Sequence, residues 1–137
     1  MESNNTYETE SKALKNQRFF GHRKLEEFSR GCKMRSATGY CPRPLETASA
    51  FLSKKWTISI VITVGNFKKL RFNDIERRLE NITAKTLTER LKELETEKII
   101  LRKAYSEIPP KVEYSLTKKG TLLMKALIPL IKWAEEQ

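Results

Sequence analysis

Polar side chains between Thr83 and Lys92 have the types and the spacing to bind a nucleic acid. They lie on or beside one face of a predicted helix, and they are Thr83, Lys85, Thr86, Thr88, Glu89 and Lys92. Lysine can donate to guanine O6 or N7 or to phosphate, threonine can bond a base edge or touch a thymine methyl group, and glutamate can accept from cytosine N4. The N–H groups at the start of the helix add a site for a phosphate. A solvated helix face would show the same residue types, so the surrounding elements must decide between the two interpretations.

Two short helices joined by a tight turn are predicted to carry this surface. The second helix spans about Ala84–Glu97, with Thr83 as its cap, and its core-facing stripe consists of Leu87, Leu91 and Leu94. The first spans about Phe72–Glu80, and Asn73 or Asp74 can cap it.

A β-hairpin with basic side chains is predicted after the second helix. Its strands are "IILRKAYSE" and "VEYSL", and the Pro-Pro pair between them marks a turn because proline cannot donate to a sheet ladder. Arg102 and Lys103 lie on the outgoing strand and Lys111 at the tip, where they would contact phosphates or let Lys111 reach a minor groove. For Arg102 and Lys103, an edge strand protected by charge is the alternative.

The remaining segments predict three more helices. "LETASAFLS" follows a proline-containing start and has helical apolar spacing. "KWTISIVITVGN" is rich in β-branched residues, which favours a strand, but its length, the Trp56/Ile60/Val64 spacing and the closing Gly65-Asn66 pair favour a buried helix, which we choose.

The last predicted helix begins after Thr117, which caps it, and runs to the end of the chain. It is apolar on more than one face, so it needs a partner beyond its own core, most simply a second copy of the chain. The expected dimer contacts are Leu123, Leu127, Leu130, Ile131 and Trp133.

Together these elements predict an α+β fold, mainly α-helical. The order of helices, turn, recognition helix and hairpin describes a winged helix-turn-helix with a two-stranded wing and a C-terminal dimerisation helix. We assign this domain to residues 41–137. Residues 1–40 are interpreted as a tail and arm that is partly disordered or helical and lies outside it.

Composition narrows the classes of function. The 137 residues carry a net charge of +10, which indicates an acidic partner, nucleic acid first and an anionic membrane surface second. The longest apolar run is too short to span a bilayer and no signal peptide is evident, so we expect a cytoplasmic protein with no membrane partner. Two cysteines and one histidine make a poor metal site, and we find no nucleophile–base pair or phosphate loop. We therefore expect no enzyme, cofactor or metal.

Several motifs resemble the HxlR-type winged-helix regulators within the wider MarR-like group. They are "CPRPLETASAFLSKKWTISIVITV", "RFNDIERRL", "ITAKTLTERLKELE", "YSEIPPKVEYSLTKKG" and "LIKWAEE". The resemblance covers about Cys41 to Glu136 and implies a homodimer, built from the first and last helices, on a two-fold operator. It carries over Lys85, Thr88 and Arg90 as recognition-helix positions and Lys111 as the wing position. The segment before Cys41 is longer than such proteins need.

Cys41 is a candidate redox sensor, since some members of that family sense oxidants or electrophiles at this Cys-Pro position. Its place near a helix N-terminus and beside Arg43 favours thiolate, and Cys32 could be a resolving partner. The alternative is a small buried residue that ties the arm to the first helix.

The sequence thus predicts a sequence-specific double-stranded DNA-binding transcriptional regulator, which acts as a homodimer, with repression as its expected mode and an oxidant or small molecule as a possible effector. The alternatives are a non-specific architectural DNA binder and a winged helix that contacts protein in a larger complex. Salt dependence and the specificity ratio distinguish a sequence-specific regulator from a non-specific architectural binder.

Overall fold

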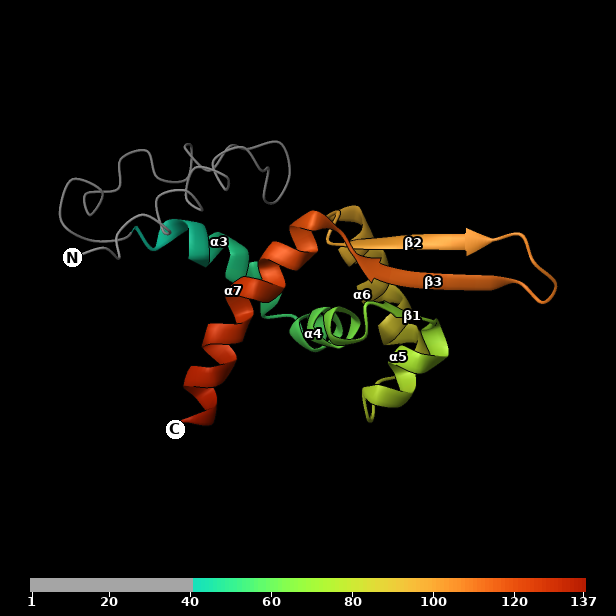
Figure 1. Ribbon diagram of the computed structural model, residues 1–137. Coiled ribbons are helices and arrows are strands. Elements are labelled where there is room, and N and C mark those ends of the chain that lie inside the picture. The colour runs from blue at the N-terminus through green and yellow to red at the C-terminus, as the bar shows by residue number, and fades with distance from the viewer. Residues whose placement is uncertain (1–40) are drawn as a thin grey trace, which may run out of the picture. The chain divides into compact units, whose positions relative to one another are not determined.

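A computed structural model describes residues 41–137 of the chain (Figure 1). The predicted tail and arm, with Cys32, lie outside the described residues. The chain divides into two units, one ending at Ser53 and the other spanning Lys54–Gln137. The first unit contains α3 (Arg43–Leu52). The second contains α4 (Thr57–Phe67), β1 (Lys69–Leu70), α5 (Phe72–Arg78), α6 (Ala84–Thr96), β2 (Ile100–Tyr105), β3 (Lys111–Leu116) and α7 (Lys118–Glu135).

Helix α4 confirms the choice of helix over strand for the β-branched segment. Ile60, Val61 and Val64 are fully buried, so tertiary packing outweighs the preference of these side chains for strands. The expectation that Gly65-Asn66 ends the helix is wrong. The helix continues through both residues to Phe67, and Gly65 lies so close to the Met124 side chain of α7 that an added Cβ would require that flexible side chain to move.

The sheet has three antiparallel strands in the order β1-β3-β2. The predicted two-stranded wing is β2 and β3, which pair from Ile100↔Leu116 to Tyr105↔Lys111. Strand β1, whose two residues pair with Ser115 and Tyr114, was not predicted, because so short a strand has no periodicity to detect. Figure 1 shows the β2–β3 hairpin extending beyond the helices of the second unit.

The helix-turn-helix is formed by α5 and α6. Thr83 caps α6 as predicted, with Oγ1 accepting from the N–H of Thr86 at 3.2 Å. The expected cap of α5 is wrong: Arg71 takes the N-cap position, and Asp74 lies three residues inside, where its Oδ2 accepts from the N–H of Arg71 at 3.3 Å. The carboxylate thus still satisfies the start of the helix, but from within its first turn.

Helix α7 begins at the predicted cap, Thr117, whose Oγ1 accepts from the N–H of Gly120 at 3.1 Å. Leu123 and Leu127 are buried within the chain, at 7% and 4% exposure, so the structure places them in the core and not on the expected dimer surface. The exposed apolar side chains of α7 lie further along, at Ile128, Leu130 and Trp133.

The core of the second unit draws on every helix and on the sheet. Its fully buried side chains are Thr57, Ile60, Val61, Val64, Ile75, Leu87, Leu94, Ile99 and Ile100. Within residues 41–137, no helix is long and apolar enough to cross a bilayer.

Candidate nucleic-acid interface

Helix α6 presents a continuous polar surface opposite its buried leucines. Leu87, Leu91 and Leu94 are buried, whereas the exposed side chains of the polar stripe are Lys85, Thr88, Glu89, Lys92 and Thr96. These positions fall within about 100° of one another around a helix of 3.6 residues per turn. The face predicted from spacing therefore exists in the fold, on the helix that follows the turn of the helix-turn-helix.

The threonine hydroxyls at the start of α6 have bonds of their own. Thr83 Oγ1 donates to Thr86 Oγ1 at 2.8 Å, and Thr88 Oγ1 donates to the carbonyl of Ala84 at 2.8 Å. Each hydroxyl has one donor and two acceptor lone pairs. Thr88, with its proton committed to Ala84, is therefore arranged to accept from a base edge or to present its methyl group, while Thr86 is half-buried.

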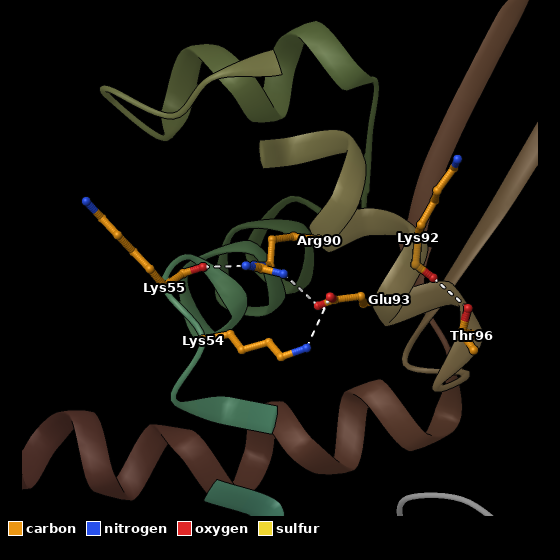
Figure 2. Close-up of polar contacts among 6 residues, drawn as sticks. All are labelled: Lys54, Lys55, Arg90, Lys92, Glu93 and Thr96. Atoms are coloured by element: carbon orange, nitrogen blue, oxygen red, sulfur yellow. Dashed lines mark hydrogen bonds and ion pairs between the residues drawn. The ribbon is translucent and has the colours of Figure 1, made fainter. Parts of the chain in front are cut away.

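Arg90 lies away from the polar stripe, contrary to its expected role as a DNA contact. Its Nε donates to the carbonyl of Lys55 at 3.2 Å, and its Nη1 lies 2.8 Å from Oε2 of Glu93 (Figure 2). Only 20% of its side chain is exposed. Figure 2 also shows Lys92 extending away from this cluster. We therefore leave Arg90 out of the candidate interface.

Glu93 is the centre of that cluster. Its Oε1 accepts from Lys54 Nζ at 3.1 Å while its Oε2 binds Arg90. Burial alone would raise the pKa of Glu93, but the hydrogen bonds from Lys54 and Arg90 outweigh it and hold the pKa below its ordinary value. The carboxylate stays ionised between two cations.

A groove joins the polar stripe of α6 to the wing. It has a volume of about 360 Å³ and is lined by residues of α5, α6, β2 and β3: Phe72, Thr88, Leu91, Lys92, Glu95, Arg102 and Tyr114. The groove brings three predicted contacts, Thr88, Lys92 and Arg102, to one concave surface. Arg102 is directly opposite the buried Tyr114 in the sheet, which places both on the face toward α6.

Lys103 and Lys111 lie on the other face of the hairpin. Side chains alternate along a strand, and the register pairs Lys103 with Glu113 and Tyr105 with Lys111. The amines of Lys103 and Lys111 lie 5.0 and 5.1 Å from the centre of the Tyr105 ring. The structure therefore separates these two lysines from Arg102, with which the sequence analysis grouped them.

Lys111 is not at the tip of the wing, where we expected it. It is the first residue of β3, and its Nζ lies 2.9 Å from Oε1 of Glu113. The hydroxyl of Tyr105 donates to Oε2 of the same carboxylate at 2.9 Å. The tip consists of residues 106–110, in which Ile108 is fully exposed before Pro109 and Pro110.

The contacts among Tyr105, Lys111 and Glu113 shift the pKa of each of the three side chains. Hydrogen bonds from Lys111 and then Tyr105 lower the pKa of Glu113, and the bond to Glu113 raises the pKa of Lys111. The same carboxylate raises the pKa of Tyr105. Lys111 is thus a cation whose charge is already balanced within the wing.

Three residues that bind predicted contact residues were not predicted from the sequence: Glu93, Tyr105 and Glu113. In the observed hairpin register, Tyr105 lies opposite Lys111 and Glu113 lies opposite Lys103, whereas the predicted turn at 108–111 would have paired Tyr105 with Tyr114. The i, i+3 spacing of Arg90 and Glu93 was a readable sign of an ion pair.

Cys41 lies directly before α3, with Pro42 at the N-cap position, and is half-buried.

Among residues 41–137, no group of three or more His, Cys, Asp or Glu side chains is arranged to hold a metal ion.

Comparison with known proteins identifies this arrangement. The profile of the HxlR-like helix-turn-helix family matches residues 51–137. YvaP, an uncharacterised HTH-type transcriptional regulator of Bacillus subtilis (strain 168), is 45% identical over 96 residues, which cover 70% of this chain and 87% of YvaP.

Solved structures agree with the sequence relatives. A MarR-family transcriptional regulator from Enterococcus faecalis V583 superposes with a TM-score of 0.65 at 32% identity, covering 72% of this chain and 89% of that one. The redox regulator HypR in its oxidised form gives a TM-score of 0.63 at 35% identity, and the match covers 69% of this chain and 96% of the HypR chain. The chain therefore belongs to the HxlR-like helix-turn-helix family, whose members are winged-helix DNA-binding transcriptional regulators.

Proposed function

We propose that this protein recognises a specific double-stranded DNA sequence as a homodimer on a two-fold operator, and that it represses transcription by occupying that operator. Helix α6 enters the major groove. Lys85, Thr88, Glu89 and Lys92 face the bases and the flanking phosphates.

The observation that carries this proposal is the exposed polar stripe of α6, which the buried Leu87, Leu91 and Leu94 hold outward. The groove beside it supports the proposal, since it places Arg102 next to Thr88 and Lys92. A helix in the major groove and a phosphate contact from the adjacent strand can then engage the same stretch of duplex.

The dimer is supported by the second half of α7. Leu130 and Trp133 are 54% and 59% exposed, and Ile131 is half-buried, so this end of the helix carries apolar surface that the rest of residues 41–137 leaves uncovered. A second copy would cover it by a two-fold contact, which also matches the symmetry of an operator.

Substitution on the polar stripe tests the DNA contacts. Lys85→Gln and Lys92→Gln should each weaken binding to the selected duplex by about 1–3 kcal/mol if the lysine contacts a base. Lys132→Gln, an exposed lysine near the end of α7, removes the same charge elsewhere and is the matched control. Fluorescence anisotropy at fixed salt gives the three affinities. Equal affinities for all three variants would overturn the assignment of α6.

A second function, response to oxidants through Cys41, is favoured by the likeness to HypR, a redox regulator. We propose that oxidation of Cys41 changes the affinity for DNA. Cys41 is next to the first turn of α3, and a helix N-terminus with a nearby arginine stabilises thiolate, the form that oxidants attack.

Paired cysteine variants test this response. DNA binding by the wild type and by Cys32→Ser should change after treatment with a thiol oxidant and recover with dithiothreitol, whereas Cys41→Ser should not respond. Unchanged binding by the oxidised wild type would remove the redox function and leave the DNA-binding proposal intact.

A further inference from the structure

We propose that Arg90 and Glu93 are positioning residues, which fix the rotation of α6 about its own axis and thereby set the specificity of DNA recognition. This inference rests on the proposed function, because it concerns how the protein distinguishes one DNA sequence from another. It assigns to Arg90 a role different from the DNA contact that its position in the motif implies.

The two residues hold the segment that precedes α4. Arg90 Nε donates to the carbonyl of Lys55, and Glu93 accepts from Lys54 Nζ at 3.1 Å (Figure 2). The bond of 2.8 Å between Arg90 and Glu93 joins these contacts into one cluster. Two side chains of α6 thus bind two consecutive residues that are more than 30 positions away in the sequence.

The segment that receives these contacts is itself held in place. Trp56 has a φ of 78°, in the left-handed region that an aromatic side chain rarely adopts. The carbonyl of Lys54 accepts from the N–H of Thr57 at 3.1 Å, and that of Trp56 accepts from Ile60 at 2.9 Å. A residue keeps such a backbone only where its surroundings determine it. The carbonyl of Lys55 is therefore a fixed acceptor against which α6 can be oriented.

The hydrogen bond from Arg90 to the carbonyl of Lys55 gives α6 a directional restraint that the apolar core does not provide. Burial of Leu87, Leu91 and Leu94 holds α6 against the core, but the hydrophobic effect is non-directional and resists a small rotation weakly. A hydrogen bond to a fixed carbonyl weakens steeply when its angle changes. A rotation that moved Lys85 and Thr88 relative to a base would distort and weaken the bond between Arg90 and Lys55.

A direct phosphate contact is the competing role for Arg90, and the two roles predict different salt dependence. A side chain that neutralises a phosphate adds about 0.9 to the slope of log K against log salt concentration. A positioning residue changes the fit of α6 to its preferred sequence and leaves the number of phosphate contacts unchanged.

The experiment measures the full chain on two duplexes, one selected from a random library by the wild type and one with the same bases scrambled. Affinities are measured across a salt series for wild type, Arg90→Gln, Arg90→Lys and Glu93→Gln. Lys85→Gln serves as the control for a side chain on the DNA-facing surface. Circular dichroism melts confirm that each variant is folded at the assay temperature.

We expect Arg90→Gln to lower the ratio of selected to scrambled affinity at least tenfold with an unchanged salt slope, and Glu93→Gln to lower it less. Arg90→Lys should not restore the ratio, because an ammonium cannot reproduce the two directed bonds of the guanidinium. A slope reduced by about 0.9 in Arg90→Gln and restored in Arg90→Lys would overturn the inference in favour of a phosphate contact. An unchanged ratio would also overturn it. If the wild type itself prefers neither duplex, the proposed function fails first, and that outcome is recognised without any variant.

Discussion

The Nζ of Lys111 lies 2.9 Å from Oε1 of Glu113, so the wing holds a carboxylate against the lysine that the sequence motif assigns to DNA. A phosphate that approached Lys111 would compete with Glu113 for the same ammonium group. The pair thus limits what Lys111 can contribute to binding.

Removal of that carboxylate should strengthen DNA binding. Glu113→Gln makes Lys111 available to a phosphate, so affinity should rise and the salt slope should steepen by up to about 0.9. Lys111→Gln in the wild-type background should have a smaller effect than Lys85→Gln. Titrations of a labelled duplex at several salt concentrations measure both. Weaker binding by Glu113→Gln at low salt would show instead that the carboxylate orients Lys111 toward DNA.

Gly120 should tolerate no side chain. A Cβ at this position would overlap the backbone carbonyl oxygen of Ile99, which cannot move without disturbing the start of α7. Gly120→Ala should therefore lower the free energy of unfolding by about 1–3 kcal/mol, as overpacked sites do, although alanine favours helix.

Gly65→Ala is the matched control for Gly120, because the atom it meets first is the sulfur of Met124, part of a flexible side chain. Gly65→Ala should lower the free energy of unfolding, measured by urea denaturation, by less than Gly120→Ala does. Equal stability of Gly120→Ala and wild type would contradict the close approach of α7 to Ile99.

Acid should weaken the cluster that orients α6. Because the pKa of Glu93 is lowered by folding, the unfolded chain takes up this proton at a higher pH than the folded chain does. The stabilisation is complete above the ordinary value of 4.5 and is lost as pH falls through the folded-state pKa. Glu93 is about one-third exposed, which limits its contribution to about 0.5 kcal/mol, or roughly 2–4 °C in Tm.

Thermal melts of wild type and Glu93→Gln at pH 7 and at pH 3.5 measure this contribution. The variant should melt lower at pH 7, and the difference should shrink at pH 3.5. Glu89→Gln, which removes a carboxylate from the exposed face of the same helix, corrects for the general change in charge. A difference that stayed constant with pH would contradict the ionised state of Glu93.

The exposed end of α7 should control self-association. Trp133→Arg and Leu130→Lys should weaken the dimer at least tenfold, since large apolar side chains at the centre of an interface carry much of its energy. Leu127→Ala should act differently, by lowering the stability of the chain itself, because Leu127 is buried. Sedimentation at micromolar concentration distinguishes these effects. A wild-type monomer there would contradict the dimer.

The helices and the wing could be predicted from apolar spacing, turn residues and two of the caps, because these are local signals. Thr83 and Thr117 mark the starts of α6 and α7 in the sequence as they do in the structure. The continuation of α4 through Gly65 could not be predicted, because Gly65 packs against Met124, which is on a different helix.

Only part of the candidate site could be predicted, because local spacing does not show contacts between residues distant in the sequence. Helical spacing is enough to assign Lys85, Thr88, Glu89 and Lys92 to an exposed face. It cannot show that Arg90 turns toward the carbonyl of Lys55, 35 positions earlier in the chain, since that partner is defined only by the tertiary fold. Partners distant in the sequence thus account for the misplaced role of Arg90.

The most direct test of the DNA-reading account is selection of bound duplexes from a random library by the full chain, with the recovered sequences measured again across a salt series. The account predicts an enriched two-fold motif whose half-sites lie about one helical turn apart, and a preference for it over scrambled DNA that persists at higher salt. Recovery of no motif, with affinity that depends steeply on salt and equally for every sequence, would contradict sequence-specific recognition by α6.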